Sequence, residues 1–181
     1  MRSFGRNLFA ALAVALAGLV FAQPKTPPLY TLSGTGWQRN TTPTGEVLTC
    51  SVCEARVQVQ IEVGPPLGPD APYRTNKQFI SQHRKQKQQR LFAEGVLKSQ
   101  IQPRSGYPPK IERTGITTFS GVEALQFRAI VDLNPVPTRS TTLLLIRRGR
   151  VVKVAVTYHE DSFDDKADKA VTALLSSIKF P

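Results

Sequence analysis

The stretch Ala55-Arg-Val-Gln-Val-Gln-Ile-Glu-Val63 alternates apolar and polar side chains. Residues two apart lie on the same face of an extended chain, so the pattern predicts a β-strand with one buried face and one wet face. A sheet therefore begins at residue 55 at the latest. The fold class follows from how many other segments repeat this two-residue period.

A first hairpin is predicted downstream of this strand. Residues 111–119 are rich in threonine. Residues 125–133 place Leu, Phe, Ala, Val and Leu at every second position, with Gln126, Arg128 and Asp132 on the other, wet face. Ser120 and Gly121 stand between the two runs. Strand-forming residues on both sides of a short turn containing glycine are typical of a β-hairpin.

A second hairpin is predicted closer to the C-terminus. Residues 141–147 contain the apolar run Leu143 to Ile146. In residues 151–158, Val152, Val154, Val156 and Tyr158 occupy every second position. Gly149 marks the turn between the two segments. Three shorter runs, 29–32, 47–50 and 178–180, carry weaker strand signals.

Two segments show helical spacing instead. Residues 163–178 place apolar side chains at intervals of three and four, with Ser162 as an expected cap and Asp164 and Asp165 at the positive end of the helix dipole. Residues 75–99 are predicted as one long basic helix that is polar in its middle. Its anchors are Ile80 and Leu91, eleven residues apart and so on one face, reinforced by Phe79 and Phe92.

Strand, long helix, two hairpins and terminal helix together predict an α+β domain, an antiparallel β-sheet flanked by helices. The segment Gly115-Ile-Thr-Thr-Phe-Ser-Gly-Val-Glu-Ala124, the second hairpin and the ending Leu174-Leu-Ser-Ser-Ile-Lys-Phe180 resemble the PsbP-like fold group. That group includes an accessory protein of the oxygen-evolving complex and small exported bacterial proteins. The resemblance implies a non-enzymatic accessory or binding domain. It does not extend to the cysteine pair or the basic helix.

Residues 1–22 have the features of a secretory signal peptide. Arg2 and Arg6 supply a positive start, an apolar run extends from Leu8 to Val20, and Ala22 ends the segment with a small residue. The run is shorter than the roughly 20 residues that a membrane span needs. We therefore expect cleavage after Ala22 and a periplasmic or secreted mature protein with no transmembrane span. An uncleaved anchor is the alternative.

The mature chain is expected to form a single domain. Cleavage leaves 159 of the 181 residues, divided into an extended segment at 23–28 and one domain at 29–181. The whole chain has 24 Lys and Arg against 13 Asp and Glu, and loss of two arginines with the leader lowers the net charge from +11 to +9. Positive charge favours anionic partners. Export makes nucleic acid a poor partner, so we expect the protein to bind another protein or an anionic envelope component. We also expect it to be a monomer.

Cys50 and Cys53 are the only cysteines in the chain. In an exported protein such a pair is expected to form a disulfide that closes a tight turn, and the bond stabilises little because the loop is short. Thiol-disulfide activity is one alternative. Metal binding, with His83 and His159 as further ligands, is the other.

No motif in the sequence points to catalysis. The chain has no Gly-x-Ser-x-Gly nucleophile elbow and no glycine-rich phosphate loop. The group His159-Glu-Asp161 with Asp164 and Asp165 has the oxygen ligands of a hard-cation site, but helix capping also explains these acids. No enzyme, no cofactor and no metal are therefore predicted.

The basic helix is the remaining candidate site. Its cations are interspersed with Gln rather than Glu, so no acidic neighbour is expected to neutralise them. The candidate anion-binding residues are Lys77, Arg84, Lys85, Lys87 and Arg90. A solvated helix face is the alternative. The predicted function is thus a non-catalytic exported accessory or binding protein of the bacterial envelope, with a thiol-disulfide protein or a binder of anionic polymer as alternatives.

Overall fold

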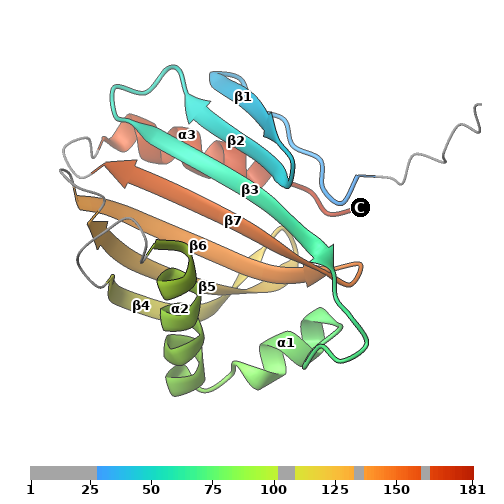
Figure 1. Cartoon of the computed structure of the whole chain (residues 1–181). Helices are drawn as coiled ribbons and strands as arrows, with labels where there is room; N and C mark the ends of the chain where they lie inside the picture. The colour runs from blue at the N-terminus through green and yellow to red at the C-terminus, as the bar shows by residue number, and fades with distance from the viewer. Residues whose placement is uncertain (1–27, 102–108, 133–136, 160–163) are drawn as a thin grey trace, which may run out of the picture.

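A seven-stranded antiparallel sheet forms the centre of the fold (Figure 1). The structure is a computed structural model that describes residues 28–101, 109–132, 137–159 and 164–181. In chain order the strands are β1 (Trp37–Thr42), β2 (Gly45–Cys50), β3 (Val57–Pro66), β4 (Lys110–Phe119), β5 (Val122–Asp132), β6 (Pro137–Arg147) and β7 (Arg150–His159). Their order across the sheet is β1-β2-β3-β7-β6-β5-β4. The predicted α+β class is confirmed.

The hairpins β4–β5 and β6–β7 confirm both predicted pairs of strands. Each is closed by a two-residue turn with positive φ at both positions: 50° at Ser120 and 76° at Gly121, then 47° at Arg148 and 66° at Gly149. Two positive φ values define the type I′ turn, whose twist matches that of the strands it joins. The glycine in each turn supplies the left-handed conformation at low cost.

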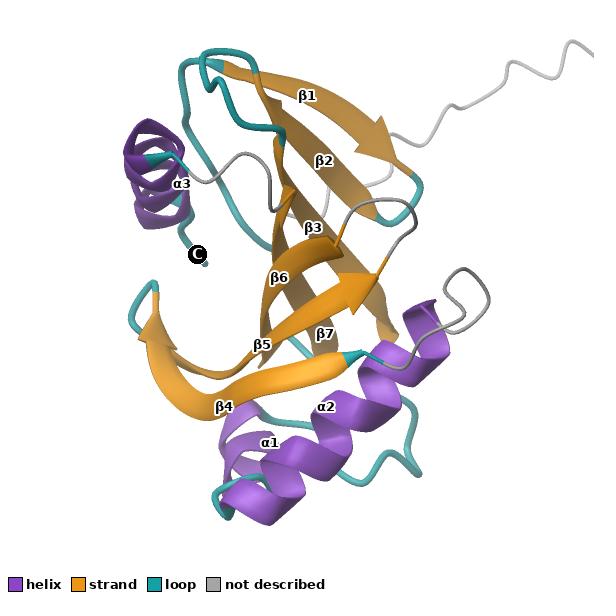
Figure 2. Cartoon of the chain, turned by 90° about the vertical axis from the view of Figure 1, so that its left-hand side faces the viewer, coloured by secondary structure: helices purple, strands orange, loops and turns teal. Residues whose placement is uncertain are grey.

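Helices cover both faces of the sheet (Figure 2). One face is covered by α3 (Asp165–Ser177), and the other by α1 (Asn76–Gln82) and α2 (Gln86–Ile101). β6 contributes to both cores because successive side chains on a strand point to opposite faces. Leu143 and Leu145 belong to the α3 side, whereas Leu144 and Ile146 belong to the α1 and α2 side. This explains the unbroken apolar run in β6.

The single helix predicted over residues 75–99 is wrong, because the structure divides this stretch into α1 and α2. α1 begins with a capping box in which Thr75 and Gln78 exchange side-chain and backbone hydrogen bonds. It ends at His83, whose backbone leaves the helical region at φ −108° and ψ 20°. The His83 imidazole is buried, with its centroid 4.5 Å from that of Phe92 on α2. Packing of this ring between the helices favours the bend.

The break changes which side chains face the sheet. Ile80 is 1% exposed but Leu91 is 59% exposed, so these two residues do not share a buried face as predicted. The buried stripe of α2 instead consists of Gln89, Ala93 and Leu97, four residues apart. Because the turn between the helices interrupts the 3.6-residue period, the phase set by Ile80 does not continue to Leu91.

The shorter predicted strands have mixed outcomes. Residues 47–50 lie within β2, whereas 29–32 and 178–180 meet only through an isolated antiparallel bridge between Thr31 and Lys179. β1 was not predicted, because its sequence Trp-Gln-Arg-Asn-Thr-Thr is polar on both faces. An edge strand with exposed side chains leaves no apolar period to detect.

The predicted C-terminal helix is α3. Its N-cap is Asp164, whose carboxylate accepts a hydrogen bond of 2.8 Å from the backbone N–H of Lys166. Ser162, the predicted cap, lies outside the described residues. The helix buries Ala167, Val171 and Leu174 against the sheet, in the spacing that the sequence predicted.

Candidate functional site

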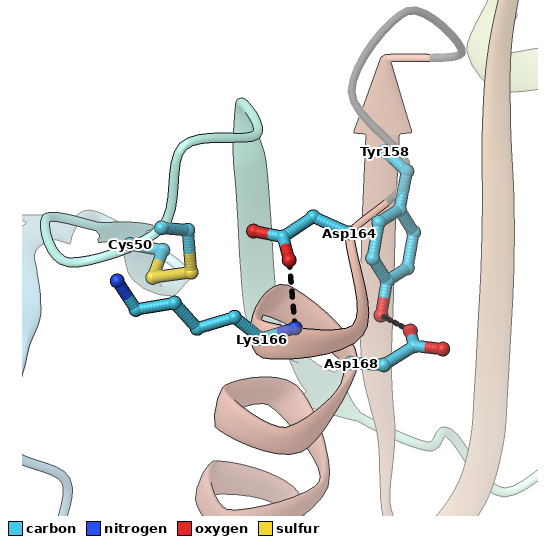
Figure 3. Close-up of a disulfide and its surroundings, with 6 residues drawn as sticks. Cys50, Tyr158, Asp164, Lys166 and Asp168 are labelled. Atoms are coloured by element: carbon cyan, nitrogen blue, oxygen red, sulfur yellow. Dashed lines mark hydrogen bonds between the residues drawn. A yellow bond between two sulfur atoms is a disulfide. The ribbon is translucent and has the colours of Figure 1, made fainter.

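The predicted disulfide between Cys50 and Cys53 is present, with 5.6 Å between the Cα atoms. Figure 3 shows it near the first turn of α3, which carries Lys166. Cys50 ends β2, and the next regular element after the pair is β3. Thioredoxin-type cysteines lie at a helix N-terminus, which activates the thiol. This pair lacks that setting and closes a loop beside the core on the α3 side.

Metal-ligating side chains do not gather in the part of the chain that the structure describes: it contains no group of three or more His, Cys, Asp or Glu placed to hold an ion. Of the hard-cation group considered from the sequence, Glu160 and Asp161 lie outside the described residues. Within the same ranges, no helix is long and apolar enough to cross a membrane.

The five basic residues predicted as an anion site do not lie on one helix. They are Lys77 on α1, Arg84 and Lys85 in the connection, and Lys87 and Arg90 on α2. The guanidinium of Arg84 lies 3.7 Å from Glu123, and that of Arg90 lies 3.4 Å from Glu94. The prediction that no acidic residue nearby in the sequence neutralises these cations is therefore wrong for Arg90, whereas Arg84 pairs with an acid on β5. The three lysines are exposed and form no ion pair with any described residue.

A pocket of about 280 Å³ lies between α3 and the sheet, and it combines polar and apolar walls. It is lined by Arg128 on β5, Arg139 and Thr141 on β6, Val156 and Tyr158 on β7, and Asp168, Val171 and Leu175 on α3. Concave sites of roughly 300–1,000 Å³ with a few convergent polar groups are the usual places for small ligands. The volume of this pocket, about 280 Å³, is at the lower end of that range and suits a small ligand.

Strand register brings the sheet residues of the pocket together. Arg128 is paired with Thr141, and Thr141 with Val156, so the three form a row across β5, β6 and β7. Arg139 and Tyr158 are paired and form the next row on β6 and β7. Side chains two residues apart on a strand share a face. Both rows therefore point toward α3.

The polar end of the pocket contains a phenol and a carboxylate. The hydroxyl of Tyr158 donates a hydrogen bond of 2.9 Å to Asp168 on α3 (Figure 3). Burial raises the pKa of Tyr158 well above its ordinary value, and the Asp168 carboxylate raises it further, while the charge of Arg128 lowers it. Tyr158 is thus a neutral hydrogen-bond donor at physiological pH.

The mouth of the pocket is cationic. Arg128 is exposed and forms no ion pair with a described residue, and its register partner on β4 is a second exposed arginine, Arg113. Arg139 lies 3.6 Å from the carboxylate of Glu112. Like charges directly opposite each other in a sheet are unfavourable. The β4–β5 register therefore places two exposed arginines opposite each other, and neither forms an ion pair with a described residue.

Two other pockets lack the combination of an unpaired cation and an apolar wall. One lies between residues 33–37 and α3 and is lined mostly by small side chains, with Trp37 at one side. The other lies beside α2, where the charges of Glu62 and Lys153 form an ion pair with each other. Only the pocket beside Tyr158, among these three, offers unpaired positive charge next to an apolar wall.

Sequence reasoning missed this pocket. Arg128 was assigned to the wet face of its strand, and the structure leaves it exposed, but nothing in the sequence placed it in a pocket with Tyr158, which was assigned to the end of an alternating apolar row. The sequence did contain one sign that both faces of the sheet are covered. The run from Leu143 to Ile146 is apolar at every position, so neither face of that strand is polar. A continuous apolar run is typical of a strand that is covered on both faces, so it indicated that helices lie on both sides of the sheet.

Comparison with known proteins finds likeness in fold only. No protein-family model and no curated protein matches the chain. The Ran-binding protein Mog1p of Saccharomyces cerevisiae has a TM-score of 0.51 at 5% identity, over 84% of this chain and 90% of that one. This score shows a shared fold.

Two further structures are similar at lower scores. PsbP of Synechocystis has a TM-score of 0.47 at 14% identity, over 84% of this chain and 87% of its own. LpqN, described as involved in cell envelope biogenesis of Mycobacterium tuberculosis, has a TM-score of 0.45 at 13% identity, over 84% and 83%. The PsbP-like fold group predicted from the sequence is represented among these matches.

Proposed function

We propose that the protein is an exported, non-catalytic accessory or binding protein of the bacterial cell envelope, with its ligand site in the pocket between α3 and the sheet. The pocket is the observation that carries the proposal, because it is a formed cavity with converging polar groups and an apolar wall. Export is supported by the signal-peptide features of the sequence at residues 1–22 and by the disulfide, a bond that persists mainly outside the cytosol.

The pocket is suited to binding rather than to bond cleavage. Its lining residues are hydrogen-bond donors, one carboxylate and apolar side chains, and neither His nor Cys is among them. Nucleophilic catalysis needs a nucleophile within hydrogen-bond reach of a base. The lining contains two hydroxyls. Thr141 has Arg128 and Val156 as its neighbours in the row, and neither is a base. Tyr158 does contact a base, Asp168, but burial and that carboxylate raise the pKa of Tyr158, which disfavours its ionised, nucleophilic form.

The protein isolated from its native envelope or growth medium is expected to begin at Gln23 and to weigh two hydrogens less before reduction than after it. Intact-mass spectrometry, first native and then denatured with alkylation, checks both points. Extra mass under native conditions would identify a bound ligand. A full-length chain whose cysteines alkylate without reduction would contradict the proposal.

The cysteine pair offers an alternative function. Thiol-disulfide exchange would require Cys50 or Cys53 to form mixed disulfides readily at neutral pH with a trapping reagent. The position of the pair between two strands, rather than before a helix, argues for a structural bond. Slow reaction of both cysteines would exclude the redox alternative.

A second candidate function is the binding of an anionic envelope polymer by the basic segment. It is favoured by Lys77, Lys85 and Lys87, which are exposed and form no ion pair with a described residue. Replacing all three by Gln is expected to weaken binding to dextran sulfate, a soluble polyanion, by about tenfold at low salt. Salt titrations of affinity measure this, because contacts between exposed charges are screened.

A matched variant separates a local site from net charge. Replacing the exposed lysines Lys98, Lys110 and Lys169 by Gln removes the same charge from other parts of the surface. Binding through the basic segment predicts a small effect of this control. An equal loss in both triple variants would show that the overall positive charge, and not this segment, attracts the polymer.

A further inference from the structure

Arg128 in the pocket lining and its neighbour on β4, Arg113, indicate the charge of the ligand. Arg128 and Arg113 are register partners on neighbouring strands, and both side chains are exposed. An anion between them would convert a repulsive pair into two favourable contacts. Guanidinium groups bind carboxylates and phosphates through two parallel hydrogen bonds, which gives direction as well as charge.

The opposite wall of the pocket indicates the body of the ligand. Val171 and Leu175 are four residues apart on α3, and Val156 faces them from β7. Val156 and Val171 are almost fully buried and Leu175 is half-buried, so the pocket of about 280 Å³ offers a small apolar surface at this wall. Covering exposed apolar surface is favourable. A short hydrocarbon or aromatic group would supply the missing contacts.

The acid in the lining limits how much negative charge the ligand can carry. Asp168 is the one carboxylate that lines the pocket, and it accepts the hydrogen bond of Tyr158. A second negative charge brought near Asp168 is repelled, and the repulsion grows with the charge of the ligand. A carboxylate carries one charge at neutral pH, whereas a phosphate monoester carries between one and two.

We propose that the pocket binds a small amphiphilic carboxylate, with its head at Arg128 and its apolar body along Val156, Val171 and Leu175. The proposal rests on the proposed function in that it takes this pocket as the ligand site. Arg113, the register partner of Arg128, adds positive charge beside the head, whereas Arg139 is ion-paired with Glu112. The Tyr158–Asp168 pair closes the polar end.

Calorimetry with four probes tests the ligand class on the purified, oxidised protein. Octanoate carries both the charge and the chain, 1-octanol only the chain, acetate only the charge, and octyl phosphate a larger charge. Octanoate is expected to bind at least about tenfold more tightly than octanol or acetate. Octanol binding as well as octanoate, or octyl phosphate binding more tightly, would overturn the proposal.

Two variants locate the binding. Arg128→Gln is expected to weaken octanoate binding by at least about tenfold, because it removes a charge-assisted contact at an exposed position. Arg56→Gln makes the same change at an exposed arginine outside the pocket and is expected to leave affinity unchanged. Leu175→Gln is expected to weaken octanoate while leaving the weak binding of acetate unaltered. Equal effects of the two arginine variants would refute the assignment.

The outcomes distinguish this inference from the proposed function. An oxidised, processed protein that does not bind octanoate overturns the ligand class and leaves export and the pocket untouched. A full-length, reduced protein from the native source contradicts the proposed function whatever octanoate does. Octanoate binding that is lost in Arg128→Gln and retained in Arg56→Gln supports the inference.

Discussion

Replacing Gly45 by alanine is expected to destabilise the protein by about 3–5 kcal/mol, near the upper end of single-substitution effects. Gly45 begins β2 and is the register partner of Glu62 on β3. A methyl group at its Cα would lie 1.9 Å from the carbonyl oxygen of Ile61. That oxygen belongs to the backbone of an inner strand, so it cannot move aside without disturbing the β2–β3 pairing. Urea unfolding followed by circular dichroism measures the change.

Gly95 provides the matched control for this substitution. It lies within α2, and a methyl group there would meet nothing within 4 Å. Alanine is favoured over glycine inside a helix by about 1 kcal/mol, so Gly95→Ala is expected to stabilise the protein by about that amount. A loss of less than about 1 kcal/mol in Gly45→Ala would show that the backbone accommodates the methyl group.

The strands that could be predicted from the sequence are those with one apolar and one polar face, or those joined by a turn that contains glycine. β3 shows clean alternation, and both hairpins have a glycine where the turn needs positive φ. β1 was missed because an edge strand with polar side chains on both faces has no apolar period. These signals are local, so they can be read without knowing the partner strand.

The helix break could not be read from the sequence, because its cause is not local. Residues 83–85 contain neither Gly nor Pro, the usual signals of a helix end. Helix α1 ends where the ring of His83 is buried against Phe79 and Phe92, with centroids 4.7 and 4.5 Å away. Those contacts exist only once α1 and α2 pack on the sheet, so tertiary packing overrides the local preference for one helix.

The pocket between α3 and the sheet depends on non-local information in the same way. Arg128, Tyr158 and Asp168 lie on three different elements, and none belongs to a recognisable motif. Their meeting follows from the registers of β5 with β6 and of β6 with β7, together with the position of α3. Strand alternation assigned Arg128 to the solvent-facing side, and the side chain is exposed. Alternation does not show that Arg128 also lines a pocket beside α3.

Phe127→Ala is expected to cost about 3–5 kcal/mol, because removing a buried aromatic ring loses its transfer free energy and leaves a cavity. Phe127 lies in the middle of β5, is 1% exposed, and belongs to the core beneath α1 and α2. The loss of stability is expected to be largest in the elements that pack on that side of the sheet, α1 and α2. Hydrogen exchange should therefore show reduced protection of the α2 amides, and urea unfolding gives the total change.

Arg128, the next residue along β5, is a control from the same strand. Successive residues point to opposite faces, so Phe127 fills one core while Arg128 lines the pocket on the other face. Arg128→Gln is expected to change stability by less than about 0.5 kcal/mol while weakening octanoate binding. If Phe127→Ala cost less than about 1 kcal/mol, the core beneath α1 and α2 would not be the close-packed layer that the buried side chains indicate. If Arg128→Gln destabilised the fold as much as Phe127→Ala, the arginine would be a structural residue and not one exposed for a ligand.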